Sequence, residues 1–185
     1  RFYILLFFCL LLGGNVNSST VDKGDNNAPF ENKRTETDYL PIADPFVMLY
    51  NNKYYAYGTG GTVNEGFACF SSDDLKNWKR ERQALSADDS YGKWGFWAPE
   101  VYYIQSKKKF YMFYSVEEHI CVATSDSPVG PFRQESKQPI WEEKSIDTSL
   151  FIDDDGTPYL YFVRFTDGNV IWVAQMTDDL MKIKK

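Results

Sequence analysis

The chain has 185 residues, of which 17% are aromatic and 25% are charged, and its formal net charge is −6 at pH 7. The acidic balance and the lack of a basic stripe argue against nucleic acid as a partner. Aromatic side chains fill the layers between β-sheets and also stack on sugar rings, so their abundance does not select a function by itself.

The N-terminal segment is typical of an export signal. Arg1 precedes an apolar run over residues 2–12, and small residues at 16–18 provide a cleavage site, so we predict a signal peptide over 1–18. The apolar run is too short to span a bilayer, which needs about 20 residues. A buried strand or an anchor helix is the alternative reading. The polar residues 19–38 are predicted to form a linker, and the protein is expected to be secreted or periplasmic, with no membrane contact after cleavage.

Residues 39–185 contain three repeated units of short apolar runs. The runs are rich in Tyr, Phe, Val and Ile and are separated by Gly, Asn, Asp or Lys turns, which is typical of an all-β fold. They occupy residues 46–50, 54–58, 66–70, 101–104, 110–114, 119–123, 150–152, 159–163 and 170–174. Each unit ends in a polar segment, and these segments start at 71, 124 and 176. A period near 50 predicts β-propeller blades of four strands, about three of them in this chain.

Two acidic residues stand at matching positions of this repeat. Asp44 precedes the first apolar run of the first unit, and Asp147 precedes that of the third unit. A repeat arranged around an axis brings matching positions together, so both carboxylates are expected to face one pocket. Paired carboxylates in one pocket are the groups that cleave glycosidic bonds. Each acid could instead serve only as a turn residue, and we favour the catalytic interpretation.

Other polar and aromatic residues gave weaker signals. The acidic run 153–155 followed by Gly156 is expected to be a solvated hairpin turn rather than a calcium site. Trp97 could be a core residue or could stack on a sugar. Glu100 could face the pocket or pair with a cation, and the sequence does not decide between these roles. His119 is the only histidine in the chain, so no metal site is predicted.

Four segments together resemble the motifs of glycoside hydrolase family 43. They are Ala-Asp-Pro-Phe-Val at 43–47, Phe-Trp-Ala-Pro-Glu-Val at 96–101, Ile-Asp-Thr-Ser-Leu-Phe at 146–151, and the blade-end segment 72–78. The resemblance covers residues 39–185. It implies a five-bladed β-propeller in the complete family fold and inverting hydrolysis of arabinose-, xylose- or galactose-containing plant polysaccharides. The activity expected from it is of the α-L-arabinofuranosidase or β-xylosidase type.

The resemblance also implies roles for individual residues. Asp44 matches the general base that deprotonates the attacking water, and Asp147 matches the acid that tunes the pKa of the general acid. Trp97 is expected to line the sugar subsite. The family's general acid is a Glu within a Glu-Gly-Pro segment, which this sequence does not contain. We therefore expect residues 39–185 to be a partial catalytic propeller, truncated at its C-terminus and inactive alone. No cofactor is predicted, and a structural calcium in the full-length protein stays open.

Two further functions remain as alternatives to hydrolysis of an oligo- or polysaccharide. The propeller could bind carbohydrate without catalysis, or it could be a structural or protein-binding module in which both acids are incidental. The catalytic hypothesis makes two structural predictions. Asp44 and Asp147 should lie at the starts of inner strands and face the axis. Aromatic strand residues such as Tyr55 and Tyr161 should be largely buried between blades.

Overall fold

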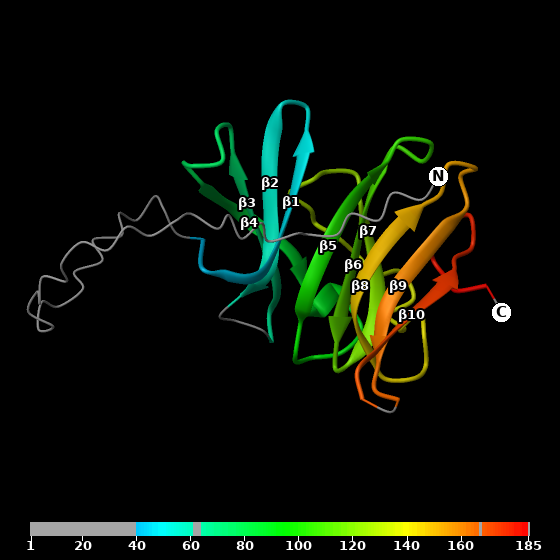
Figure 1. The fold of residues 1–185 in the computed structure, drawn as a ribbon. Helices are drawn as coiled ribbons and strands as arrows, with labels where there is room; N and C mark the ends of the chain where they lie inside the picture. Colours follow the sequence, from blue (N-terminus) through cyan, green and yellow to red (C-terminus); the bar gives the residue numbers. More distant parts are fainter. Residues whose placement is uncertain (1–39, 61–63, 167, 185) are drawn as a thin grey trace, which may run out of the picture. The chain divides into compact units, whose positions relative to one another are not determined.

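The structure is a computed structural model that describes residues 40–60, 64–166 and 168–184 (Figure 1). The predicted signal peptide (1–18) and linker (19–38) lie outside the described residues and stay predictions. Within the described ranges, no helix is long and apolar enough to cross a membrane.

The described residues form an all-β fold, as the sequence predicts, and every one of the nine predicted apolar runs lies in a strand. The strands are β1 (Ile42–Tyr50), β2 (Lys53–Gly60), β3 (Gly66–Ser72), β4 (Lys79–Ser86), β5 (Trp97–Ile104), β6 (Lys109–Val116), β7 (His119–Ser125), β8 (Ser145–Ile152), β9 (Pro158–Arg164) and β10 (Val170–Gln175). A short 3₁₀ turn, η2 (Ala87–Asp89), follows β4. β1 and β2 are joined by a tight turn in which Asn51 and Asn52 adopt left-handed backbone angles, a conformation that asparagine tolerates.

The strands form three antiparallel sheets in which neighbours in the chain are neighbours in space. The sheet orders are β1-β2-β3-β4, β5-β6-β7 and β8-β9-β10. β1 lies against β5, and β5 lies against β8, so the first strands of the three sheets are adjacent. Figure 1 shows the sheets following one another as blades. The fold is therefore a partial β-propeller of three blades, whose inner strands are β1, β5 and β8.

The expectation of four strands in every blade is wrong for the second and third blades within the described residues. After β7 the chain carries Pro128 and Pro131, and proline has no backbone N–H to donate to a strand ladder. The chain instead crosses to the first blade, where the Phe132 N–H donates to the Ala84 carbonyl at 2.7 Å. The next residue, Arg133, exchanges two backbone hydrogen bonds with Thr124 of β7, at 2.9 and 3.0 Å. This segment therefore links two blades and adds only an isolated bridge to its own.

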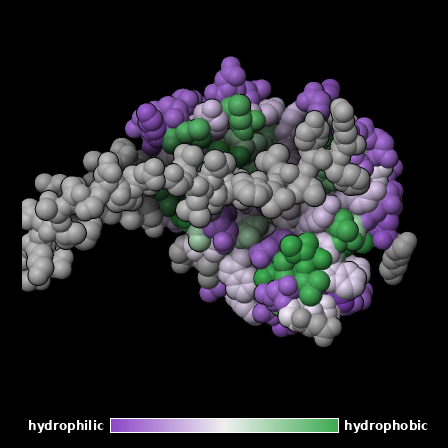
Figure 2. Space-filling model, in the orientation of Figure 1, coloured by the Kyte–Doolittle hydropathy of each residue, from purple (hydrophilic) through white to green (hydrophobic). Residues whose placement is uncertain are grey.

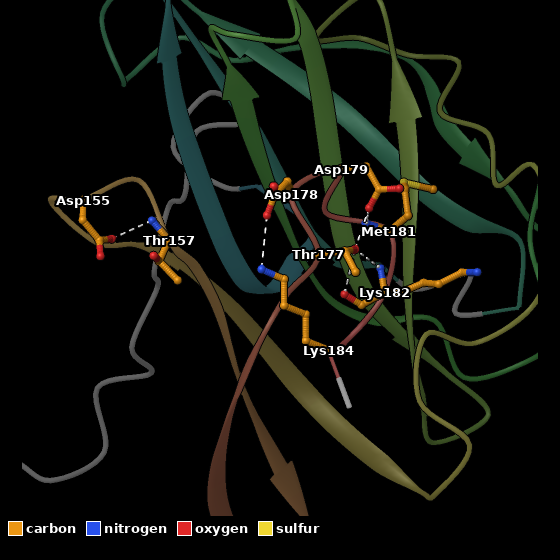
Figure 3. A network of polar contacts seen from close by, with 8 residues as sticks. All are labelled: Asp155, Thr157, Thr177, Asp178, Asp179, Met181, Lys182 and Lys184. Atoms are coloured by element: carbon orange, nitrogen blue, oxygen red, sulfur yellow. Dashed lines mark hydrogen bonds and ion pairs between the residues drawn. The ribbon is translucent and has the colours of Figure 1, made fainter.

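The polar segments that close the first and third blades form hydroxyl–carboxylate turns. In the first blade, Asp74 Oδ1 accepts the Asn77 N–H at 2.8 Å. In the third, the Thr177 hydroxyl donates to Asp179 Oδ1 at 2.5 Å, and Asp179 Oδ1 also accepts the Met181 N–H at 3.1 Å (Figure 3). These hydrogen bonds lower the pKa of both carboxyl groups below its ordinary value. The repeated acids of the closing segments are thus turn residues.

Aromatic packing joins the blades. Between the first and second blades, the Phe67 ring lies 5.7 Å from Phe96 and 5.5 Å from Tyr114, with all three side chains fully buried. Between the second and third blades, Phe113 belongs to a buried cluster with the third-blade residue Leu160. Aromatic pairs at these separations add to the hydrophobic gain from burial.

The predicted burial of strand aromatics fails for Tyr161, which is 41% exposed, and Tyr55 is only half-buried. Tyr161 lies on β9, and the neighbouring β10 exposes Ile171 (73%), Trp172 and Val173. Figure 2 shows hydrophobic surface over this part of the third blade. These side chains are exposed because the described residues place no further blade against β9 and β10, whereas the faces between two blades are buried.

The buried cluster between the second and third blades, which contains Phe113 and Leu160, should contribute strongly to the stability of the fold. Phe113→Ala should lower the free energy of unfolding by about 3–5 kcal/mol, because it empties a fully packed site between two blades. Phe151→Ala is the matched control, since Phe151 is 48% exposed and exposed substitutions change stability by about 0.5 kcal/mol or less. Urea unfolding followed by tryptophan fluorescence measures both. Equal losses for the two variants would contradict this packing.

Candidate active site

The inner strand of every blade carries one extra residue at the same place. The pairing of β1 with β2 shifts between Ala43 and Phe46, that of β5 with β6 between Trp97 and Glu100, and that of β8 with β9 between Ile146 and Ser149. In each case three steps along the inner strand match two steps along its partner. Such β-bulges bend a strand and redirect a side chain, and they are common beside active sites.

The residue that opens each bulge has a left-handed backbone. The φ angles are 47° for Asp44, 46° for Ala98 and 54° for Asp147. Aspartate adopts this conformation more readily than most residues, whereas alanine is strained there by about 1–2 kcal/mol. Asp44 thus lies inside β1, two residues after its start, rather than before the strand. Opposite the first bulge stands Gly58, where an added Cβ would meet the Ala43 carbonyl oxygen at 2.5 Å.

The three bulges line one pocket of about 280 Å³. Each blade contributes three consecutive residues at equivalent positions: Asp44, Pro45 and Phe46 from β1, Ala98, Pro99 and Glu100 from β5, and Asp147, Thr148 and Ser149 from β8. The volume is near the lower end of the range of about 300–1,000 Å³ for small-molecule sites. The repeat therefore brings the two predicted acids, Asp44 and Asp147, into one pocket. A third carboxyl group, that of Glu100, lines the same pocket.

Hydroxyl groups of the second strands hold the bulges in place. The Ala98 N–H donates to Thr59 Oγ1 of the preceding blade at 2.9 Å, and the Asp147 N–H donates to Ser115 Oγ of its preceding blade at 3.1 Å. Thr59 also donates to Asp44 Oδ2 at 2.7 Å. A backbone N–H that a bulge removes from its ladder thus regains an acceptor on the adjacent blade.

The two acids influence each other electrostatically. Partial burial raises the pKa of Asp147 above its ordinary value, and the charge of Asp44 raises this pKa further. Because the raised pKa belongs to the folded state, the stability linked to Asp147 is fully present below its unfolded-state pKa. That stability is lost as the pH rises through the folded-state pKa. Asp147 thus ionises less readily because it is partly buried and, to a smaller degree, because Asp44 is charged.

The structure also shows where Glu100 and Trp97 lie relative to the pocket. Glu100, undecided from the sequence, lines the pocket and accepts a hydrogen bond from the Tyr102 hydroxyl. Tyr102 in turn accepts the Leu150 N–H at 3.2 Å, which ties β5 to β8. Trp97 is not among the residues that line the pocket around the two acids. It is half-buried immediately before Ala98 and meets the exposed Trp94 edge-on, with ring centroids 6.3 Å apart.

The acidic turn at the end of β8 behaves as the sequence predicts. The Gly156 N–H donates to the Asp153 carbonyl at 2.8 Å, and Asp155 Oδ1 accepts the Thr157 N–H at 2.8 Å (Figure 3). These hydrogen bonds lower the pKa of Asp155. No group of three or more His, Cys, Asp or Glu residues suited to a metal occurs among residues 40–60, 64–166 and 168–184.

Comparison with known proteins identifies the family. The family description "Glycosyl hydrolases family 43" matches residues 40–185, which include all ten strands and the pocket. The chain belongs to glycosyl hydrolase family 43.

Relatives of several specificities share this fold. A crystal structure of an endo-1,4-beta-xylanase from Bacteroides thetaiotaomicron VPI-5482 is 86% identical and superimposes with a TM-score of 0.78, over 82% of this chain and 52% of that chain. An arabinoxylan arabinofuranohydrolase from Bacillus subtilis is 30% identical over 64% of this chain and 30% of its own length. An extracellular endo-alpha-(1->5)-L-arabinanase 1 from the same organism is 27% identical over 69% of this chain and 44% of its own length. The chain thus spans about half or less of these relatives.

The sequence alone did not reveal the two hydroxyl groups that accept the bulge N–H groups beside the pocket. Thr59 and Ser115 each stand directly after the second apolar run of their unit, 54–58 and 110–114. That shared position was a detectable signal. Its meaning depended on the bulges, because only the bulged pairing brings these hydroxyls to the backbone of the next blade.

The coupling of the two acids yields a pH prediction. In Asp44→Asn, the pKa of Asp147 should fall, because a neighbouring negative charge is removed. It should stay above the ordinary value, since burial is the larger cause of the shift. Carbon-13 NMR of the aspartate carboxyl groups over a pH titration measures this. A pKa of Asp147 that is unchanged or higher in the variant would show that the two carboxyl groups do not interact.

Proposed function

We propose that this chain supplies the base and the pKa-tuning acid of an inverting glycosidase. Asp44 is the general base and Asp147 the acid that tunes the general acid. The observation that carries the proposal is the pocket itself, in which equivalent bulges direct both carboxyl groups to one cavity. A binding or structural propeller does not require two acids at strained, equivalent positions.

The proposed reaction follows from the chemistry of paired carboxylates. The ionised Asp44 accepts a proton from a water, whose oxygen attacks the anomeric carbon as the glycosidic bond breaks. The leaving oxygen receives a proton from a general acid, which we propose to be a Glu in a part of the full-length protein beyond this sequence. In inverting enzymes the base and the acid stand about 6.5–9.5 Å apart, which leaves room for the water.

Asp147 contributes through charge rather than through a bond to the sugar. An ionised carboxylate beside the general acid raises the proton affinity of that acid, so the acid stays protonated until the leaving oxygen needs the proton. The position of Asp147 on β8, across the pocket from Asp44 on β1, suits a role between the base and a later blade. We expect the 185-residue chain alone to show no hydrolysis, since it has no assigned proton donor.

We propose plant polysaccharides or oligosaccharides that contain xylose or arabinose as substrates. The name of the xylanase that is 86% identical favours xylose, and the names of the curated relatives favour arabinose. Activity of the β-xylosidase or α-L-arabinofuranosidase type is the finer part of the proposal. Trp97, with the exposed Trp94 beside it, is the proposed aromatic contact for a sugar ring at the margin of the pocket.

Export is also part of the proposal. The N-terminal pattern of residues 1–18 supports a signal peptide, and a relative with an extracellular location supports secretion. Polysaccharides too large to enter a cell require an enzyme outside the cytoplasm, so location and substrate agree.

The Asp44→Asn variant of the full-length protein tests the proposal. The substitution keeps the shape of the side chain and its left-handed backbone but removes the base. The rate of hydrolysis of aryl xylosides and arabinofuranosides should fall by about 10²–10⁴, the usual contribution of general-base catalysis.

Asp154→Asn is the matched control, because Asp154 is an exposed acid of the turn after β8. It should leave the rate unchanged. Parental activity in the Asp44→Asn variant would show that Asp44 is not the base. Binding of xylo-oligosaccharides without hydrolysis by the parental protein would support the carbohydrate-binding alternative.

A further inference from the structure

We propose that Thr59 is a positioning residue for the base, which fixes the orientation of the Asp44 carboxylate and couples it to the docking of the second blade. This inference rests on the proposed role of Asp44. Thr59 lies near the end of β2 and does not line the pocket, so it acts through Asp44 rather than on the sugar.

The hydrogen bonds of Thr59 determine where its proton points. The Ala98 N–H can only donate, and it reaches Thr59 Oγ1 at 2.9 Å. The single hydroxyl proton of Thr59 is therefore available to Asp44 Oδ2, which lies 2.7 Å away. Hydrogen bonds to an ionised acceptor are stronger than neutral ones. One carboxylate oxygen is thus held, and Oδ1 remains for the proton of the attacking water.

The repeat provides an internal comparison for this arrangement. Thr59 pairs with Ala43 next to the first bulge, and Ser115 pairs with Trp97 next to the second. Ser115 likewise accepts a bulge N–H from the next blade, that of Asp147. The bulge residue of its own blade, however, is Ala98, which has no carboxylate to receive a proton. Both hydroxyls therefore accept a bulge N–H from the next blade, whereas of the two only Thr59 also donates to a carboxylate.

The charges around Asp44 give this contact a measurable effect. The ionisable groups that share the pocket are Asp147 on β8 and Glu100 on β5, and both are acidic. Among the described residues of β2, the group in contact with the Asp44 carboxylate is the neutral Thr59 hydroxyl. The Thr59 hydroxyl is thus the contact on β2 that fixes the carboxylate, and its donor hydrogen bond to a charged group is a strong one. Loss of this hydroxyl should therefore release the Asp44 carboxylate from its orientation and lower kcat.

Kinetics of Thr59 variants in the full-length enzyme test the proposal. Thr59→Val keeps the size of the side chain but removes the hydroxyl. Its kcat should fall about 10- to 100-fold, as expected for loss of a hydrogen bond to a charged group, with little change in KM. Thr59→Ser keeps the hydroxyl and should restore the parental kcat.

Ser115→Ala is the matched control for bulge support. It removes the equivalent contact between blades and should lower stability as Thr59→Val does. Its loss of kcat should be smaller than that of Thr59→Val, because the Ser115 hydroxyl accepts the Asp147 N–H and contacts no carboxylate among the described residues. If Thr59→Val does not fold, Thr59→Cys replaces it, because a thiol of similar size is a weak donor and should also lower kcat.

Two outcomes separate this inference from the proposed function. Parental activity in Asp44→Asn would overturn the proposed function itself. An inactive Asp44→Asn together with a parental kcat in Thr59→Val or Thr59→Cys would overturn only the role of Thr59. In the Asp44→Asn background, Thr59→Val should cause no further loss of rate, since no base remains to be oriented.

Discussion

One extra residue in the inner strand of each blade is the constraint on which the site depends. A regular strand would point alternate side chains to opposite faces of its sheet. The bulge breaks this alternation once, at the same place in β1, β5 and β8, and the residue at the break adopts a left-handed backbone. Among the residues that the structure describes, the lining of the pocket consists of the three residues at each break.

The bulges depend in turn on the contact between blades. Two bulge N–H groups find their acceptors on the preceding blade, through Thr59 and Ser115. The aromatic layers beside these contacts hold the blades at the required separation. The geometry of the pocket therefore depends on the packing of the blades, and a change that loosens two blades also moves a carboxylate. The strain at Ala98, which has no acidic side chain to contribute, shows that the repeat imposes the bulge even where no carboxylate is present.

The sequence predicted the repeat, the strands and the two acids for clear physical reasons. Apolar runs of strand length and polar turns are local signals, and Asp44 and Asp147 stand in the same local context. The number of strands per blade was not predictable in this way. Phe132 pairs with the first blade while Arg133 makes only an isolated bridge to its own, and this arrangement depends on tertiary contacts. The exposure of Tyr161 was also missed, because a strand pattern does not tell which face a neighbouring blade covers.

We propose that Asp44 activates a water that attacks from the side opposite the leaving group. The most direct measurement of this role is proton NMR of the first sugar that the full-length enzyme releases, recorded before the anomers equilibrate. Attack from the opposite side should release a sugar of the anomeric configuration opposite to that of the substrate. A first product with the configuration of the substrate would show retention, in which one carboxylate is a nucleophile about 5–5.5 Å from the acid, and would contradict the role of Asp44 as a base.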